Sequence, residues 1–394
     1  MKKSQQEQHV RNTMTFVRQL HQSGYAPSTV AEYADAFARK HGVKFTLDVT
    51  PTKITAVFHE PINQVVIESI SPPSVNLRQL VTTIRQFKNT RKGDLSQVNA
   101  LSYPNWVICF ANLLLPPCYL LLIGSSYESA FLSILFGFIA WLGMHLLRNE
   151  RAPLIELLTA FLSSFIIGLV SHYNQELPVL ALCISATLLF VPGLTVTNSL
   201  ASLAINDYRS GLELMAQSGL IIIKLVIGIV LGLGAAELIL PVGETVQVNH
   251  THSLWIQVPA LLLISMAIGL VFNGGFRTIL LGLPAAGIGL WGPQVFTPDW
   301  LIGTWISTVL IILYGIAVSK ITHLPPFTYI VQGFIIIVPG TRIMVGASDG
   351  LYSTSILGTP NVGLNAVLMF AAIVAGQITT FALMNKHFKV SAYN

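Results

Sequence analysis

Two segments, TLLFVPGLTVTN (187–198) and GFIIIVPGTRIM (333–344), decide the fold of this chain, because each interrupts an apolar run with Val-Pro-Gly. Proline lacks the N–H that a helix needs, and glycine tolerates unusual backbone angles. In lipid, backbone groups freed in this way must be buried in protein or face water. Matched breaks in the two halves of a membrane protein are typical of a transporter binding site. The pair therefore predicts a carrier.

Composition separates the chain into two parts. Of its 394 residues, 53% are hydrophobic and 10% are charged, whereas about 25% are charged in a typical soluble domain. Thirteen of the 22 Lys and Arg residues and seven of the 17 Asp and Glu residues precede residue 103. We therefore expect a soluble domain over 1–102 and an α-helical polytopic membrane protein after it. The net charge of +5 does not indicate nucleic-acid binding, because basic residues gather on the cytosolic side of membrane proteins.

The first 102 residues show the pattern of a small cytosolic α+β domain. The expected elements are helices over 7–22, 28–41 and 75–90, and strands over 43–49, 53–58 and 63–69. Asn76 or Ser74 is expected to cap the third helix. No catalytic pattern is present here. The sequence leaves three roles open for this domain: gating of the inner mouth, binding of substrate for sensing, and assembly.

Ten apolar segments follow the soluble domain. A helix needs ~20 residues to cross the hydrocarbon, and the fourth and ninth segments are short because each stops at a Val-Pro-Gly break. Ten segments divide into two five-helix halves, 103–240 and 254–386. Since an odd number of crossings inverts the second half, the sequence predicts 5+5 inverted repeats, an arrangement used for alternating access. The segments are 103–123, 128–147, 153–171, 177–191, 213–240, 254–272, 276–291, 300–318, 325–338 and 361–384.

Basic residues in the loops agree with this topology. With the N-terminal domain in the cytosol, seven basic residues fall in or beside inner loops, and one, Arg342, falls in an outer loop. This distribution predicts a multi-pass protein of the cytoplasmic membrane with both termini cytosolic. The inner residues are Arg148, Arg151, Arg209, Arg277, Lys320, Lys386 and Lys389.

Several stretches of the chain resemble the threonine/serine exporter family, in the single-chain form that joins two membrane halves behind a cytosolic domain. In and just after the N-terminal domain these are LHQSG (20–24), TPTKI (50–54), VNLRQL (75–80), GDLS (93–96) and SYPNW (102–106). The most specific are VPGLTVTNSLASLAINDYRSGLELMA (191–216) and IIIVPGTRIMVGASDG (335–350). The resemblance implies export of threonine and serine from the cytosol, driven by the proton gradient.

The two breaks are the expected substrate site. Exposed N–H groups at a helix N-terminus bind a carboxylate, and carbonyls freed before a break can accept from the ammonium group of an amino acid. The alternative is that each Val-Pro-Gly is a kink that serves helix packing. The candidate residues are Pro192, Gly193, Thr195, Thr197 and Asn198 at the first break, and Pro339, Gly340, Thr341, Arg342 and Ser348 at the second.

Ionisable residues near the membrane segments are candidates for proton coupling, because a charge in hydrocarbon is costly. Asp207 and Asp349 each follow a break, although a loop charge and a turn are the simpler interpretations. Lys224 lies inside the fifth segment. Its partner must come from another helix, because Glu213 lies ~16 Å away along the axis, and Glu156 is the expected one. The alternative is that Lys224 snorkels to the inner headgroups.

Two other classes of protein compete with a carrier. GASDG (346–350) matches the GxSxG pattern of a serine hydrolase with Ser348 as nucleophile, but it lacks the strand-turn-helix context and a nearby histidine. A passive channel or scaffold would need no matched breaks, and no ring of charge or filter motif is apparent. Gly228 and Gly232 form a GxxxG that predicts a close helix contact. No cofactor or metal site is expected. The sequence leaves the oligomeric state open, a homo-oligomer included.

Overall fold

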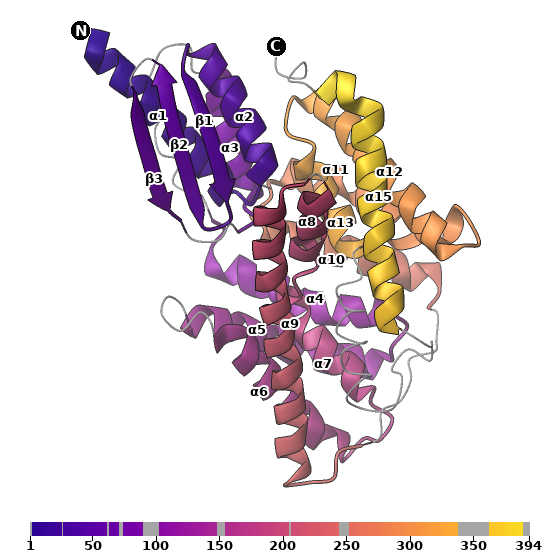
Figure 1. Cartoon of the computed structure of the whole chain (residues 1–394). Coiled ribbons are helices and arrows are strands. Elements are labelled where there is room, and N and C mark those ends of the chain that lie inside the picture. Colours follow the sequence, from indigo (N-terminus) through magenta and orange to yellow (C-terminus); the bar gives the residue numbers. More distant parts are fainter. Residues whose placement is uncertain are drawn as a thin grey trace.

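The computed structural model shows an N-terminal domain containing a small sheet and a larger helical part (Figure 1). In Figure 1 the sheet and its helices lie together at the upper left, next to the start of the long helix α9. The residues that the structure describes are 2–25, 27–60, 63–70, 74–89, 102–147, 154–204, 206–243, 252–337 and 362–388.

The N-terminal domain packs three helices against one face of a three-stranded antiparallel sheet with strand order β1-β2-β3. In β2 the side chains of Ile54, Ala56 and Phe58 are buried, while those between them are partly exposed, so only one face of the sheet is covered. The elements are α1 (Lys2–Gln22), α2 (Pro27–Lys40), β1 (Lys44–Thr50), β2 (Lys53–Glu60), β3 (Gln64–Ser69) and α3 (Leu77–Asn89).

The expected helices and strands of this domain are present, with bounds that differ by a few residues. The largest difference is at α1, which begins at Lys2 instead of residue 7. The residues before Glu7 carry no apolar stripe, but Lys and Gln are good helix formers and extend the helix at little cost. Asn76 caps α3 as predicted, because its Oδ1 accepts a hydrogen bond from Gln79 N at 3.0 Å.

The membrane part is helical throughout its described residues, and each of the ten predicted apolar segments contains a helix. One more helix, α8, follows the first Val-Pro-Gly. The helices are α4 (Asn105–Leu122), α5 (Tyr127–Leu146), α6 (Ile155–Ser171), α7 (Val179–Thr187), the 3-10 turn η2 (Leu188–Phe190), α8 (Gly193–Ala204), α9 (Tyr208–Glu237), α10 (Leu254–Val271), α11 (Phe276–Val295), α12 (Trp300–Thr322), α13 (Phe327–Ile337) and α15 (Val362–Phe388).

Within the described residues, six helices are long and apolar enough to cross a bilayer, and a seventh span results if the bent α7–η2–α8 segment counts as one. α6 and α13 are apolar but shorter, at 17 and 11 residues. The chain is therefore a polytopic helical membrane protein. Large apolar side chains such as Phe131, Trp255 and Leu383 are exposed along these helices, as a lipid-facing surface requires.

The same pairs of helices contact each other in the two halves of the membrane part. In the first half α4 packs on α5, α5 on α6, and α6 on both α7 and α9. In the second half α10 packs on α11, α11 on α12, and α12 on both α13 and α15. The two halves meet along α4 and α10, and α8 of the first half crosses to α13 and α15.

The most extensive of these contacts joins α6 and α9. A Cβ built on Gly228 would lie 2.7 Å from Leu157 O, and one built on Gly232 would lie 2.5 Å from Phe161 O. Since real Cβ atoms are not found this near a carbonyl oxygen, only glycine fits at either position. The structure confirms the close helix contact that the GxxxG predicted.

Candidate functional site

The first Val-Pro-Gly breaks a membrane helix in the way the sequence predicts. α7 continues into one turn of 3-10 helix, Val191 is extended, and α8 starts at Gly193. The axes before and after the break differ by 62°. Pro192 and Gly193 are both buried, so the irregular backbone is enclosed in protein, as the absence of water in lipid demands.

The break lies at the junction of the two halves. Leu188 and Leu189, just before it, pack into an apolar cluster that also holds Ile335 and Ile336 from the end of α13. After the break, α8 contributes Leu194, Val196 and Leu200 to a second cluster, which contains Phe334 and Ile337. The last turn of α13 therefore contributes to the same two clusters as the residues on either side of the first break.

The three candidate polar side chains at the start of α8 have different surroundings. Thr197 is buried, and its hydroxyl donates to Gly193 O at 3.0 Å on its own helix. Thr195 and Asn198 are partly exposed. The Thr197 hydroxyl is thus already bonded at the break, whereas Thr195 and Asn198 are better placed to meet a ligand.

The second break follows α13 directly, but it lies outside the described residues. Of the predicted site this concerns Pro339, Gly340, Thr341, Arg342, Ser348 and Asp349. Their roles, and the hydrolase alternative that depends on Ser348, stay predictions.

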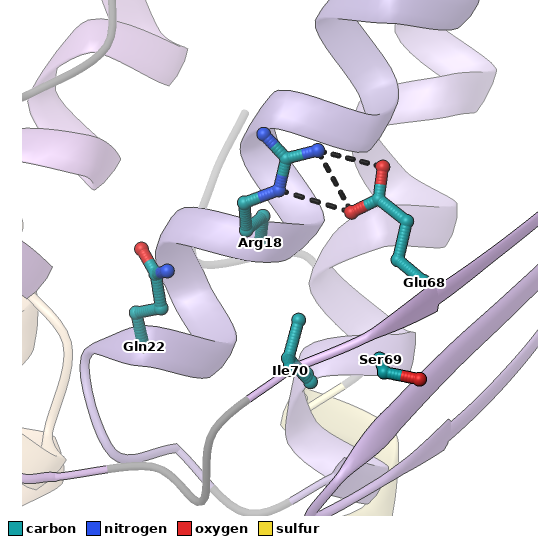
Figure 2. Close-up of a pocket in the computed structure, with 5 residues that line it drawn as sticks. All are labelled: Arg18, Gln22, Glu68, Ser69 and Ile70. Carbon is teal, nitrogen blue, oxygen red and sulfur yellow. Dashed lines mark hydrogen bonds and ion pairs between the residues drawn. The ribbon is translucent and has the colours of Figure 1, made fainter. Parts of the chain in front are cut away.

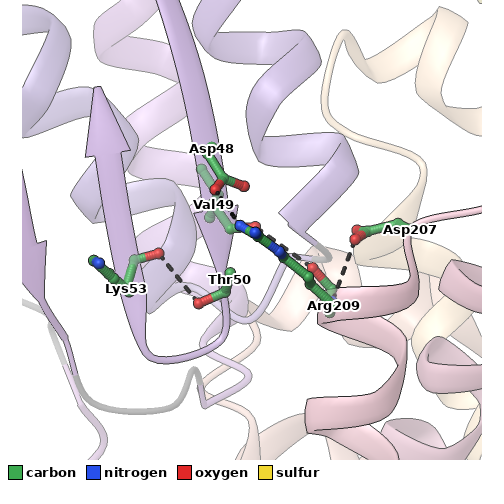
Figure 3. A network of polar contacts seen from close by, with 7 residues as sticks. Asp48, Val49, Thr50, Lys53, Asp207 and Arg209 are labelled. Atoms are coloured by element: carbon green, nitrogen blue, oxygen red, sulfur yellow. Dashed lines mark hydrogen bonds and ion pairs between the residues drawn. The ribbon is translucent and has the colours of Figure 1, made fainter. Parts of the chain in front are cut away.

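Asp207 is the N-cap of α9, the helix that follows α8. Its side chain accepts a hydrogen bond from Ser210 N at 3.2 Å. Arg209, the second residue of α9, reaches to Asp48 of β1, with Arg209 Nη1 3.2 Å from Asp48 Oδ2 (Figure 3). Ser199 ties α8 to α9, because its hydroxyl donates to Gly211 O at 2.7 Å. Asp207 thus has a structural role in a helix hairpin that starts at the break.

Lys224 forms an ion pair with Glu156, the partner that the sequence suggested, with Nζ and Oε2 3.4 Å apart. Glu156 is the second residue of α6, so Lys224 lies level with the beginning of that helix. α9 has 30 residues, more than the ~20 that a span needs, so the position of Lys224 along α9 does not by itself fix its depth in a bilayer. The pair links α6 and α9, which share the most extensive helix contact, at one end of that contact.

A buried amide near the second break was not singled out from the sequence. Gln332 on α13 is fully buried, and its Oε1 accepts from Ser265 Oγ of α10 at 2.6 Å. Its Nε2 is buried without a partner among the described residues, and the amide fits against Gly282, where a Cβ would lie 2.5 Å away. The sequence feature that could have identified Gln332 is its single amide side chain inside the apolar run that forms α13.

Buried hydroxyl groups also follow one side of α6. Thr159, Ser163 and Ser164 each have an oxygen that is buried and has no hydrogen-bond partner among the described residues. Glu156, Thr159 and Ser163 follow helical spacing and share one face. This polar face begins at the Lys224–Glu156 pair.

An open cavity of about 540 Å³ lies in the N-terminal domain, lined by Arg18, Gln22, Glu68, Ser69 and Ile70. In Figure 2 the side chains of Arg18 and Glu68 face each other, and Arg18 Nη2 lies 2.6 Å from Glu68 Oε1. The pair balances the charge of the cavity and ties α1 to the end of β3. This cavity is separate from the helix break.

The comparisons with known proteins give one match. A family model with the description "Putative threonine/serine exporter" matches residues 12–235. Neither a curated protein nor a solved structure matches the chain significantly.

Proposed function

Because the matched residues, 12–235, make up more than half of the 394, the chain belongs to the threonine/serine exporter family, and we propose that it is a secondary active exporter of these small hydroxy amino acids. Export would run from the cytosol across the cytoplasmic membrane and be driven by the proton gradient. In this topology both termini are cytosolic.

One observation carries this proposal: a buried break in a membrane helix lies between the two halves, next to the helix that leads into the second break. Leu188 and Leu189 share an apolar cluster with Ile335 and Ile336. Helix interruptions are costly in lipid and are tolerated where they line a cavity or are enclosed by protein. A buried break beside α13, the helix that precedes the second Val-Pro-Gly in the sequence, agrees with a carrier's binding site between the two halves.

The chemistry of the first break suits a zwitterion. The first turn of α8 offers backbone N–H groups and the positive end of the helix dipole to a carboxylate. The carbonyls just before Pro192 suit the ammonium group, and Thr195 or Asn198 suits the substrate hydroxyl. We assign Thr341, Arg342 and Ser348 to the same site from the other half.

The proposed mechanism is alternating access between inverted repeats of five helices each. The matched helix pairs support it, since α6 packs on α9 as α12 packs on α15, and α5 on α6 as α11 on α12. The halves meet through α4 and α10, the first helix of each. Rocking of one half against the other around this contact would expose the junction to the two sides in turn.

The experiment that tests the proposal is export from proteoliposomes loaded with labelled threonine or serine, with and without an imposed pH gradient. We expect release of both amino acids, accelerated when the outside is acidic. Counterflow of unlabelled substrate should accelerate exchange in a carrier and leave a passive channel unaffected. Loss of label at the same rate from loaded vesicles that contain no protein would contradict the proposal.

Alanine at Asn198, and separately at Thr341, should weaken substrate binding. Each removes a hydrogen bond to a charged or hydroxyl group of the substrate, an interaction whose loss costs roughly 1.5 kcal/mol or more, or about tenfold in KM. The measurement is the concentration dependence of export. The Thr197→Val variant, which keeps the side-chain volume and loses only a bond within α8, should affect KM less. Unchanged KM in both alanine variants would contradict the site.

Asp207→Asn and Asp349→Asn test which carboxylate carries the proton. Asparagine caps a helix as well as aspartate does, so the first variant keeps the N-cap of α9 and removes only the titrating group. If Asp207 couples transport to protons, the export rate of the Asp207→Asn variant should become independent of pH across a series from pH 5 to 8, while substrate exchange continues. If the export rate of both variants still depends on pH, neither Asp207 nor Asp349 carries the coupled proton.

A further inference from the structure

The N-terminal domain contacts the α8–α9 hairpin through one strand. Asp48 pairs with Arg209 at 3.2 Å, and Ser210 Oγ lies 3.5 Å from Val49 O (Figure 3). His21 lies behind this strand, with Nε2 3.2 Å from Thr50 O. Burial lowers the pKa of His21, so the ring is neutral at pH 7. Asp48 and Arg209 form an ion pair in this contact, and the carboxylate of Glu213, farther along α9, also acts on the His21 ring.

The same domain contacts the second half of the membrane part through α3 and the end of α1. Leu77 N donates to Phe272 O at 2.9 Å in the α10–α11 loop, and Leu77 is buried. The rings of Tyr25 and Phe327 lie 5.5 Å apart. Farther along α3, Val81 joins an apolar cluster with three residues of α12, α13 and their loop: Val318, Leu324 and Tyr329.

These two contacts differ in strength. The side chains of Arg209 and Asp48 are 81% and 57% exposed, and exposed ion pairs contribute little to stability and weaken with salt. A hydrogen bond of 3.5 Å is at the limit of the geometric range. The contact with the second half buries apolar side chains and includes a backbone hydrogen bond of ordinary length. The contact on α9 is therefore the weaker of the two.

We infer that the N-terminal domain is a latch: it stays on α10–α13 throughout the transport cycle and releases the α8–α9 hairpin when the site between the halves opens. This inference rests on the proposed function, because release matters only if the halves move. Ser199 and Gly211 hold α8 and α9 together, so release at Arg209 frees the helix that begins at the break. Asp48 and Arg209 are thus positioning residues for transport.

The test compares two cross-links on the full chain in proteoliposomes. Asp48→Cys with Arg209→Cys spans the proposed release point, and Tyr25→Cys with Phe327→Cys spans the fixed contact. Both are made in a background in which the native Cys109, Cys118 and Cys183 are replaced by alanine, and both receive the same short, thiol-cleavable bifunctional reagent. We expect the first cross-link to reduce threonine export at least tenfold and the second to leave it within twofold.

Cleaving the reagent should restore export in the first variant, which separates the latch from damage to folding. A second readout needs no export: cross-linking at 48 and 209 should fall when threonine and a pH gradient are present, while cross-linking at 25 and 327 stays constant. Normal export through an intact cross-link at 48 and 209, or an equal block at both pairs, would overturn the inference. If the uncross-linked proteins export nothing, the proposed function fails instead.

Discussion

A Gly232→Leu protein should lose the packing of α6 on α9 and, with it, export. A leucine side chain must occupy the space of Phe161 O and Phe165 N, which lie 2.5 and 3.0 Å from a built Cβ. Backbone atoms cannot rotate away as a flexible side chain can, so the helices must separate. We expect a loss of about 3 kcal/mol, the upper part of the range for overpacked sites, and export below a tenth of normal.

Gly234→Leu is the matched control for this prediction. Gly234 lies two residues along the same helix, is exposed, and has no atom within 4 Å of a built Cβ. Both substitutions gain the same helix propensity, roughly 1 kcal/mol, so a difference between them isolates the contact. The measurements are the thermal midpoint of the detergent-purified protein, followed by size-exclusion chromatography, and threonine export. Equal midpoints for the two variants would show that α6 and α9 are not in close contact.

Breaking the Lys224–Glu156 pair from one side should be the second-largest effect. Lys224→Met leaves the Glu156 carboxylate without its partner, and removing one member of a fully buried pair costs about 3–5 kcal/mol. The side chains here are 32% and 19% exposed, so we expect about 2 kcal/mol, reduced from that range because the pair is only partly buried. Glu156→Gln should cost a similar amount, since it leaves Lys224 charged and unpaired.

The double variant, Lys224→Met with Glu156→Gln, distinguishes a structural pair from a coupling pair. With both charges gone, no unpaired charge remains, and the thermal midpoint should return close to that of the original protein. If the pair also moves protons, export will stay low although stability recovers. Lys320→Met, at an exposed lysine near the end of α12, serves as the control. A midpoint unchanged in every single variant would contradict the ion pair.

Local patterns predicted the elements well. The Asn76 cap depends on residues within one turn, and the breaks depend on the backbone chemistry of proline and glycine, so both were readable from short stretches. The bend after η2 and the start of α8 at Gly193 agree with this expectation. The ten apolar segments all hold helices, yet α6 and α13 are too short to count as spans by length alone. The apolar segments therefore predicted where helices form, whereas the described helices meet the length for a crossing at only six or seven of them.

Long-range contacts explain what the sequence missed. Gln332 is one amide in an apolar run, and nothing local indicates that it meets Ser265, which is 67 positions away. Lys224 was expected to pair with Glu156 of another helix and does so, but the sequence did not show that the pair lies at the beginning of α6. Nothing in residues 1–102 alone showed that Leu77 would bond the α10–α11 loop, or that Asp48 would meet Arg209.

Hydrophobic segment length and helix breakers are properties of neighbouring residues, and they were enough to identify a polytopic membrane protein and the position of its first helix break. The meeting of the first break with the end of α13, the Ser265–Gln332 hydrogen bond and the contacts of the N-terminal domain with the membrane helices arise from packing between distant segments. Each of these depends on which apolar surfaces bury one another most completely. That choice is a sum over many weak contacts from the whole chain, so no short stretch contains it.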